Sequence, residues 1–300
     1  MKLLVFGSLN IDIVLQVDHF VSAGETLQAR ETKVFPGGKG LNQAVAAARA
    51  GSLVFMAGNV GSDGGFLIDL MKENEVDSTF VRQVEGSTGA AYIQVDPTGQ
   101  NCIVLAPNAN VNNSKAYIEQ VLASFETGDT ILLQNEINCL PELIELAHQK
   151  GMNIYLNPSP FNDSIIQSPL HLVSGFILNE VEGRQITGQT DPHQILKTML
   201  QKYPSADVIL TIGPKGALFM NQNLLIEQKA FDVKPVDTTA AGDTFTGYYL
   251  ACLSTGMDQR SALQLASKAA NIAITIQGAT SSIPWMASVL QSTIQEMKDS

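Results

Sequence analysis

The chain has 300 residues, 45% of them hydrophobic, and is therefore long enough to bury the core of one large α/β domain. Its formal net charge of −11 argues against nucleic acid or an anionic membrane as a partner. No apolar run approaches the roughly 20 residues that a membrane span needs, and the run Leu3–Phe6 ends too early for a secretory signal. The three cysteines are too widely spaced for a zinc site or a disulfide framework, which favours the reducing cytoplasm.

The run Leu3–Phe6 is short and continuously apolar, which predicts a strand buried on both faces. Asn10 and Asp12 follow it on alternate positions, so an extended chain presents both side chains on one side. Ligands gather at the carboxyl ends of strands in open α/β sheets, and these two residues can hold vicinal hydroxyls there. The alternative is a pair of Asx turns in a polar loop.

Ile13–Val17 and Leu27–Lys33 alternate apolar and polar residues, which predicts strands with one face in water. Ala90–Val95 and Asn101–Leu105 flank an Asp-Pro-Thr-Gly turn and predict a hairpin. These segments belong to two insertions that we expect to form one small sheet, a lid over the core.

We expect a single domain over residues 1–300, with the lid formed by insertions at about 13–36 and 88–107. Elsewhere strands and helices alternate, which predicts a three-layer α/β/α fold with a doubly wound, mostly parallel sheet. The other predicted strands are Leu53–Ala57, Thr130–Gln134, Asn153–Leu156, Phe176–Leu178, Asp207–Thr211 and Ala217–Met220. The predicted helices include Phe66–Asn74, Ser114–Ser124, Pro141–Lys150, Glu180–Thr187, Pro192–Lys202, Gly242–Ser254, Gln259–Gln277 and Trp285–Lys298.

The glycine-rich segment Pro36–Gly40 precedes an alanine-rich helix that Gly51 closes. Its spacing does not fit GxxxxGK[ST], which excludes a phosphate loop of that class. Glycines permit close backbone approach to a polar ligand, and Lys39 and Asn42 at the helix start can hold sugar hydroxyls. A purely structural glycine turn would require neither polar residue.

The segment Asp237–Phe245 combines small residues with two aspartates and leads into an apolar helix. Its small residues, with Gly242 among them, let backbone N–H groups surround a ligand, and the positive end of the helix favours an anion. Asp243 lies in the first helical turn, where it can deprotonate a hydroxyl that attacks a phosphoryl group. The alternative for Asp243 is an ordinary helix cap.

Polar residues also follow the later strands, at the carboxyl ends where a doubly wound sheet binds its ligands. Glu136 follows one strand, and the Thr211–Gly216 turn follows another and places Lys215 near nucleotide phosphates. Asn179 and Glu182 begin a helix after a third strand. Mg²⁺ prefers oxygen ligands and keeps several waters, so Glu182 can hold it through water. A plain first-turn carboxylate is the competing interpretation of Glu182.

Together these segments resemble the ribokinases of the PfkB-type carbohydrate kinase family. The resemblance covers the full length and rests on Gly7–Asp12, Gly37–Gln43, Asp237–Asp243 and Ser281–Trp285. The second and third of these segments match the two signatures of the family. The resemblance implies a ribokinase-like fold with a β-sheet lid and ATP-dependent phosphorylation of the primary hydroxyl of a free pentose, D-ribose to D-ribose 5-phosphate.

The resemblance also implies roles for individual residues. Asp243 matches the general base, beside the backbone amides of Ala240, Ala241 and Gly242. The positions that match sugar contacts are Asn10, Asp12, Gly38, Lys39, Asn42, Glu136 and Asp243. The positions that match nucleotide contacts are Asn179, Thr211, Gly213, Gly216 and Gly242, with Ser267 where another side chain often flanks the adenine.

The resemblance implies two metal sites and a dimer as well. Glu182 matches the acidic residue tied to Mg²⁺. A monovalent cation, usually K⁺, is surrounded largely by backbone carbonyls at positions that match Asp237, Thr239, Ala273, Ile276, Gly278 and Ser282. Members of the family commonly form homodimers through their lid sheets.

Some residues depart from the family pattern. Leu41 replaces a small residue beside the sugar loop and is expected to change the shape of the pocket, and Pro214-Lys215 replaces a commoner serine-bearing turn. The alternative acceptors are therefore 2-deoxyribose, fructose or a nucleoside such as adenosine. A catalytically silent sugar-binding sensor is a further alternative, against which the intact Asp243 and Glu182 argue.

Overall fold

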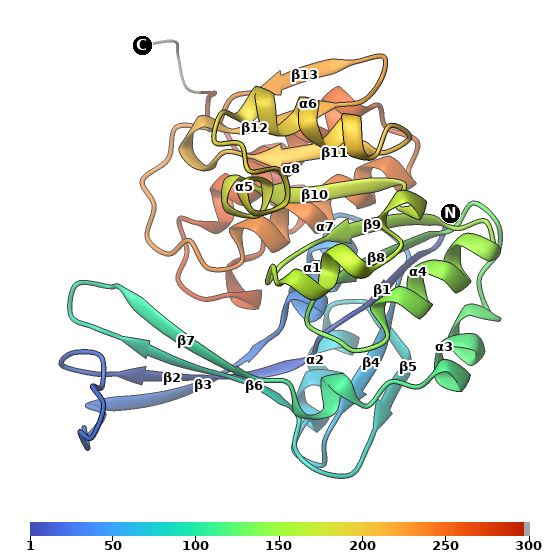
Figure 1. Cartoon of the computed structure of the whole chain (residues 1–300). Helices are drawn as coiled ribbons and strands as arrows, with labels where there is room; N and C mark the ends of the chain where they lie inside the picture. Colours follow the sequence, from blue (N-terminus) through green and yellow to red (C-terminus); the bar gives the residue numbers. More distant parts are fainter. Residues whose placement is uncertain (297–300) are drawn as a thin grey trace.

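A nine-stranded sheet forms the centre of the computed structural model, which describes residues 1–296 (Figure 1). All neighbouring strands are parallel except at one edge, where β12 runs antiparallel to both of its neighbours. The strands in spatial order are β13 (Leu225–Gln228), β12 (Ala217–Met220), β11 (Asp207–Thr211), β10 (Gly175–Asn179), β9 (Asn153–Asn157), β8 (Thr130–Gln134), β1 (Leu3–Phe6), β4 (Val54–Val60) and β5 (Asp77–Gln83).

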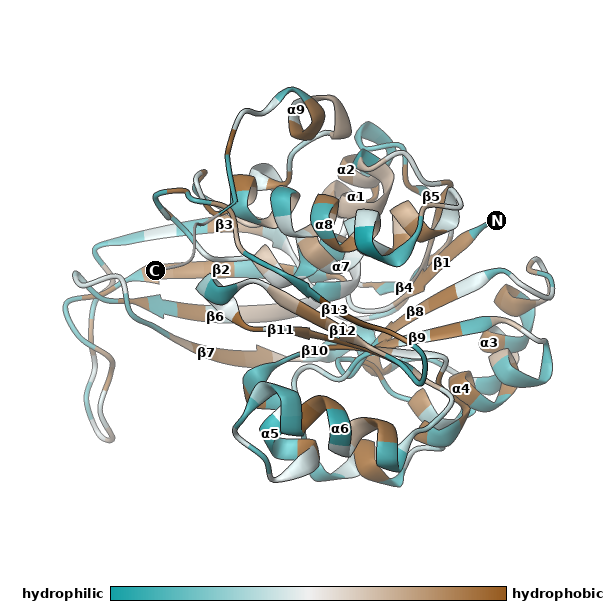
Figure 2. Cartoon of the chain, turned by 90° about the horizontal axis from the view of Figure 1, so that it is seen from above, coloured by the Kyte–Doolittle hydropathy of each residue, from teal (hydrophilic) through white to brown (hydrophobic). Residues whose placement is uncertain are grey.

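Helices cover both faces of this sheet, as the view from above shows (Figure 2). Side chains of β1 alternate between the two resulting cores, with Leu3 and Val5 in one and Leu4 and Phe6 in the other. The first core is covered by α1 (Lys39–Arg49), α2 (Gly65–Glu73), α7 (Ala241–Ser254), α8 (Gln259–Ala273) and α9 (Met286–Gln291). The second is covered by α3 (Lys115–Leu122), α4 (Leu140–Gln149), α5 (Glu180–Thr187) and α6 (Pro192–Lys202).

A separate four-stranded sheet projects from one side of the core (Figures 1 and 2). Its order is β3 (Glu31–Gly37), β2 (Asn10–Gln16), β6 (Gly89–Val95) and β7 (Asn101–Ala106), in which only the β2–β6 pair is parallel. The sheet leaves large apolar side chains in solvent, namely Val34, Phe35, Tyr92, Ile103, Val104 and Leu105.

The predicted α/β/α fold with a mostly parallel sheet is confirmed. Several elements agree residue for residue with the prediction, among them β1, β8, β11, α5 and α6. The pattern of apolar residues does not predict β5 and β13, the two edge strands. Both carry polar residues that an edge strand exposes to water, so neither shows the continuous apolar run of the inner strands.

Two helices end earlier than predicted. The helix predicted over Gln259–Gln277 ends at Ala273, because the carbonyl of Ile274 accepts instead from the backbone of residues 236 and 237. The helix predicted over Trp285–Lys298 ends at Gln291. Residues 295 and 296 pair in extended form with residues 231 and 232, and Lys298 lies outside the described residues.

The order of the strands creates a crevice beside β1. The chain runs from β1 to β4 on one side and later returns to β8 on the other, so the direction of winding reverses between β1 and β8. Ligands bind outside the carboxyl ends of strands at such a reversal. Within residues 1–296, every helix is too short or too polar to cross a bilayer.

Candidate active site

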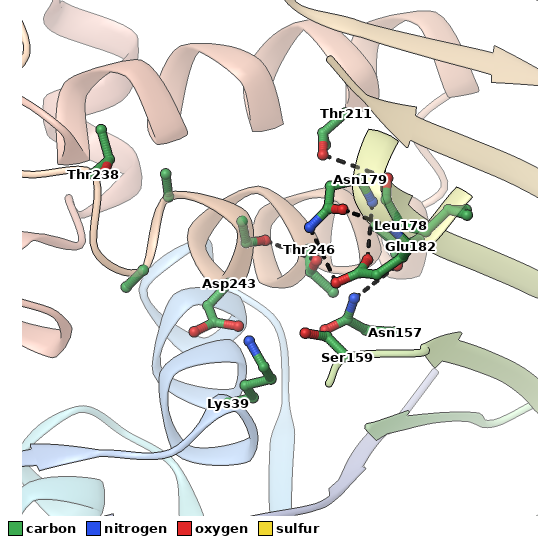
Figure 3. Close-up of a pocket in the computed structure, with 14 residues that line it drawn as sticks. Lys39, Asn157, Ser159, Leu178, Asn179, Glu182, Thr211, Thr238, Asp243 and Thr246 are labelled. Atoms are coloured by element: carbon green, nitrogen blue, oxygen red, sulfur yellow. Dashed lines mark hydrogen bonds between the residues drawn. The ribbon is translucent and has the colours of Figure 1, made fainter. Parts of the chain in front are cut away.

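A cavity of about 240 Å³ opens at the carboxyl ends of the central strands (Figure 3). Residues from α1, β9, β10, α5 and α7 line it, so segments far apart in the sequence meet there. They are Lys39, Asn157, Ser159, Ile177, Leu178, Asn179, Glu182, Thr211, Thr238, Ala240, Ala241, Gly242, Asp243 and Thr246. The start of α7 contributes the central stretch of this wall, and the N–H groups of its first turn have no carbonyl partner four residues earlier within the helix.

Asp243 is buried at the floor of this cavity, with 9% of its surface exposed. Asn42 Nδ2 donates to its Oδ2 atom at 3.1 Å, and Gln43 Nε2 donates to its Oδ1 atom at 2.8 Å. The amino group of Lys39 points toward the same carboxylate (Figure 3). Asp243 is therefore held by side chains of α1 and makes no side-chain cap for α7.

Close packing of α7 on α1 produces this arrangement. Gly247 lies one turn after Asp243, on the same face of α7. A Cβ atom on Gly247 would lie 2.5 Å from the carbonyl oxygen of Gln43 and 2.5 Å from Cβ of Ala46. Only glycine lets the two backbones approach this closely, and that approach brings the amides of α1 within reach of Asp243.

Two more carboxyl groups, those of Asp12 and Glu136, lie on the side of the site that faces the four-stranded sheet. Burial, together with the charges of Glu136 and Asp243, raises the pKa of Asp12 to about 7. Burial also raises the pKa of Glu136, although Lys39 and the Ser8 hydroxyl act in the opposite direction. Ser8 Oγ donates to Glu136 Oε2, and the backbone N–H of Lys39 donates to the same atom at 3.3 Å.

Lys39 is the cation shared by these carboxylates. Burial lowers its pKa, but Asp243, Glu136 and Glu182 outweigh that effect and raise the pKa overall. Lys39 is therefore charged and partly neutralises the acidic cluster.

Asn10 is the first residue of β2, and a hydrogen bond fixes the orientation of its side-chain amide. Asn110 Nδ2 donates to Asn10 Oδ1 at 2.7 Å, which leaves the amide N–H groups of Asn10 as its outward donors. Asn10 and Glu136 line a second cavity of about 260 Å³, whose apolar wall includes Ala90 and Leu105 of the four-stranded sheet.

Asn179 and Glu182 form a reciprocal capping box at the start of α5. The backbone N–H of Asn179 donates to Glu182 Oε2 at 2.9 Å, and its side-chain amide donates to Oε1 at 3.0 Å. Both residues also line the first cavity (Figure 3). The structural interpretation of Glu182 therefore holds, and its carboxylate still faces the cavity.

Not every residue expected at the nucleotide site lines the first cavity. Thr211 does, whereas Gly213, Lys215, Gly216 and Ser267 do not. Gly216 lies close to the neighbouring strand, since an added Cβ would come within 2.0 Å of the carbonyl oxygen of Gln228. Ser267 is buried in α8, and its hydroxyl has no partner among the described residues.

Leu41 also lies away from both cavities. It is fully buried in the core beneath α1. The expectation that it changes the shape of the pocket is therefore wrong, because the helix turns its side chain inward.

The residues expected around a monovalent cation come from two loops that meet. Asp237 Oδ1 accepts from the backbone and hydroxyl of Thr239 at 2.9 and 2.6 Å, and Oδ2 accepts from the backbone of Gly278 at 2.9 Å. Burial raises the pKa of Asp237, but these hydrogen bonds outweigh burial and lower the pKa overall. Ala273 accepts from the backbone of Ile276, and Ser282 Oγ donates to the carbonyl of Ala279.

Several side chains of the site have no predicted role. Gln43 contacts Asp243 directly, and Asn157, Ser159 and Thr246 line the cavity. The position of Asn157 and Ser159 just after a strand was a usable signal. Gln43 belongs to the glycine-rich signature, but nothing near it in the sequence indicates its partner, which lies 200 residues away.

Known proteins resemble this chain over nearly its whole length. A model described as "pfkB family carbohydrate kinase" matches residues 1–286. A ribokinase from Haemophilus influenzae is 34% identical over 291 residues, which cover 94% of this chain and 95% of that protein.

Solved structures give the same result. The crystal structure of a ribokinase from Thermotoga maritima has a TM-score of 0.84 and 35% identity, and the match covers 96% of this chain and 97% of that one. A ribokinase from Arabidopsis thaliana complexed with ribose and ATP has a TM-score of 0.84 and 28% identity, with 97% of each chain covered.

Proposed function

The chain belongs to the pfkB family of carbohydrate kinases, and we propose that it transfers the terminal phosphoryl group of ATP to the primary hydroxyl of D-ribose. The observation that carries this proposal is the buried Asp243 carboxylate at the start of α7, with a cavity on one side and a cluster of hydroxyl-binding groups on the other. The ribokinase relatives and the ribokinase complex with ribose and ATP support ribose as the acceptor.

The acceptor sugar lies, in this proposal, between the core and the four-stranded sheet. The N–H groups of Asn10 donate to a hydroxyl oxygen, and the carboxylates of Asp12 and Glu136 accept from hydroxyls. Gly38 lets the chain approach the sugar closely, and Lys39 binds a sugar hydroxyl. Asn42 lies at the reacting end, where it already holds Asp243.

Asp243 is the proposed general base. It accepts the proton of the primary hydroxyl as that oxygen attacks the terminal phosphorus of ATP, and the bond to the ADP oxygen breaks in line. The first-turn amides at Ala240, Ala241 and Gly242 stabilise the charge on the transferred group, since they line the same cavity. Asn179 and Thr211 lie on the nucleotide side of that cavity.

Two features of the described residues bear on Mg²⁺. No group of three His, Cys, Asp or Glu residues converges within residues 1–296, so a cage made only of protein ligands is absent there. Glu182 nevertheless faces the cavity with a carboxylate whose oxygens keep further lone pairs, which suits a metal held through water and nucleotide phosphates. When bound, Mg²⁺ neutralises charge on the phosphate oxygens.

We also propose a K⁺ site between the loops that carry Asp237 and Gly278. Thr239, Ala273, Ile276 and Ser282 would surround the ion, largely with backbone carbonyls. The support is the ionised Asp237, which ties the loop before α7 to the loop after α8 and so places a charge beside several carbonyls. Because Asp237 lies six residues before Asp243, an ion there would steady the start of α7.

Finally, we propose that the four-stranded sheet acts as a lid and joins two copies of the chain as a homodimer. On one face of this sheet the exposed side chains of Val34, Tyr92 and Val104 lie in one row, with Ile13 between the first two, and such an apolar band is unusual on the surface of a monomer. The three cysteines are free, which fits a reducing cytoplasm. Cell fractionation with an antibody would test that location.

The central prediction concerns activity. Purified protein should release ADP from ATP fastest with D-ribose in a coupled assay, and more slowly with 2-deoxyribose, fructose or adenosine. Asp243→Asn should lower kcat by about 10²–10⁴-fold, because an amide cannot accept the proton. Binding of ribose and ATP, measured by calorimetry, should stay nearly intact. Undiminished turnover in Asp243→Asn would remove Asp243 from this role, and a faster alternative sugar would replace ribose.

The affinity for ribose should depend on pH. Asp12 is mostly protonated below its pKa of about 7, and a neutral carboxyl accepts hydroxyl protons less strongly than a carboxylate. Affinity should therefore increase as pH rises through about 7 and level off above it. Calorimetry between pH 5.5 and 8.5 measures this change. Asp12→Asn, which has no titrating group at this position, should bind ribose more weakly and with an affinity that does not change with pH. An affinity of the wild type that does not change with pH would contradict the prediction.

Replacing Na⁺ with K⁺ at constant ionic strength should raise kcat. Asp237→Asn should lose most of this response, because the amide lacks the charge that attracts the ion. The rates of both proteins in the two salts, at saturating ribose and ATP, provide the measurement. Equal wild-type rates in Na⁺ and K⁺ would count against the cation site.

Light scattering should give twice the chain mass of 32.2 kDa. Val104→Asp should shift the protein to monomers, since it places a charge in the apolar band. Leu53→Asp is the matched control. Leu53 is 59% exposed and Val104 is 60% exposed, but Leu53 lies outside the four-stranded sheet. A monomeric wild type would contradict this proposal.

A further inference from the structure

Two side-chain amides hold the Asp243 carboxylate, one on each oxygen. Asn42 donates to Oδ2 and Gln43 donates to Oδ1. An amide group is nearly symmetric in shape, and turning it over replaces its donor by an acceptor. A carboxylate that faced two amide oxygens would be repelled, so something must fix the orientation of each amide.

A second side chain fixes each amide from behind. Thr280 Oγ1 donates to Asn42 Oδ1 at 2.9 Å, and Gln134 Nε2 donates to Gln43 Oε1 at 2.7 Å. With its oxygen engaged in this way, each amide can present only N–H groups to Asp243.

The four supporting side chains are buried, with exposed fractions of 5% for Asn42, 1% for Gln43, 0% for Gln134 and 2% for Thr280. Water therefore cannot replace a missing donor at low cost. The free oxygen of Gln134, Oε1, has no partner among the described residues, so turning this amide over would set two oxygens against each other at Gln43.

Thr280 is itself held by the helix that carries Asn42. Arg49, near the end of α1, donates from Nη1 to the carbonyl of Thr280 at 3.1 Å and to that of Ile283. Its guanidinium lies 5.4 Å from the centre of the Trp285 ring. Residues at both ends of α1 therefore bind the loop that carries Thr280, and they hold Asn42 and this loop in fixed positions relative to each other.

We propose that Thr280 and Gln134 are positioning residues for phosphoryl transfer, each of which fixes the amide that holds one oxygen of Asp243. The inference rests on the proposed role of Asp243 as the base. It assigns a purpose to two buried side chains that touch neither cavity. Without Thr280 and Gln134 the two amides can turn over, and the Asp243 carboxylate loses well-oriented donors. It then binds a proton more readily and moves out of the orientation in which it can accept the proton of the attacking hydroxyl.

The charged groups around Asp243 are Lys39 on α1, Asp12 on β2 and Glu136 after β8, all of which interact with it electrostatically. Thr280 and Gln134 carry no charge. Substitutions at these two positions therefore leave the charged groups in place and change only the orientation of the amides.

The test compares Thr280→Val with Thr280→Ser. Valine keeps the shape and removes the hydroxyl, whereas serine keeps the hydroxyl and removes a methyl group. Thr280→Val should lower kcat about tenfold or more at pH 7 and shift the acid limb of the kcat profile upward by about half to one pH unit. Thr280→Ser should restore most of kcat and the wild-type limb. The KM for ATP should stay within about twofold in both.

Gln134→Met supplies an independent variant for the other oxygen, since methionine is similar in length and cannot donate. It should shift the acid limb in the same direction. Thermal unfolding of every variant verifies the fold, and assays at several K⁺ concentrations separate this effect from a disturbed cation loop.

The proposal is overturned if Thr280→Val and Thr280→Ser lose activity equally. It is also overturned if kcat falls in Thr280→Val and Gln134→Met with an unmoved pH profile. An inactive Asp243→Asn alongside either result would leave the proposed function standing, whereas an active Asp243→Asn would refute the function itself.

Discussion

The approach of α7 to α1 is the contact on which the site depends. Gly247 has no side chain at the point where the two helices touch, and the resulting separation is short enough for Asn42 and Gln43 to reach Asp243. A carboxylate that is 9% exposed would otherwise pay a large desolvation cost for its charge. Amide donors offset that cost without adding a second charge, as the proposed role of Asp243 as a base requires.

The two sides of the site differ in the charged groups that line them. Toward the four-stranded sheet, where we propose that the acceptor binds, carboxyl groups are crowded and burial raises the pKa of both Asp12 and Glu136. Around the first cavity, where we propose that the phosphates bind, the wall includes several small residues and the start of a helix. Lys39 lies between the two sides and interacts with carboxylates of both. A net charge of −11 is therefore compatible with binding a polyanion, because the local field is set by amides and one lysine.

Most of the core was predictable because buried parallel strands such as β8 and β11 carry unbroken apolar runs. The edge strands β5 and β13 were missed because their exposed faces dilute that signal. The ends of α8 and α9 depend on hydrogen bonds to a loop near residue 236 and to residues 231 and 232, which no local pattern records.

The same limit applied to the site. Motifs identified Asp243 and Lys39, whose positions in short segments carry the information. Several hydrogen bonds of the site join residues at least 100 positions apart, namely Gln43 to Asp243, Asn110 to Asn10 and Thr280 to Asn42. Only the fold could show them. Leu41 was misjudged because the direction of a side chain on a helix depends on which face the helix buries.

The contact between Gly37 and Asp12 bears on how such a site can change over generations. A Cβ atom on Gly37 would lie 2.2 Å from the carboxyl group of Asp12, so this glycine is fixed by crowding and any replacement displaces a carboxylate that we propose as a sugar ligand. By contrast, Ala90 and Leu105 contribute only an apolar wall to the second cavity. Selection for a new acceptor would therefore act on apolar positions of the projecting sheet such as Ala90 and Leu105, while Gly37 and Asp12 stay constant. The same sheet holds both positions that are free to change and positions that crowding keeps fixed.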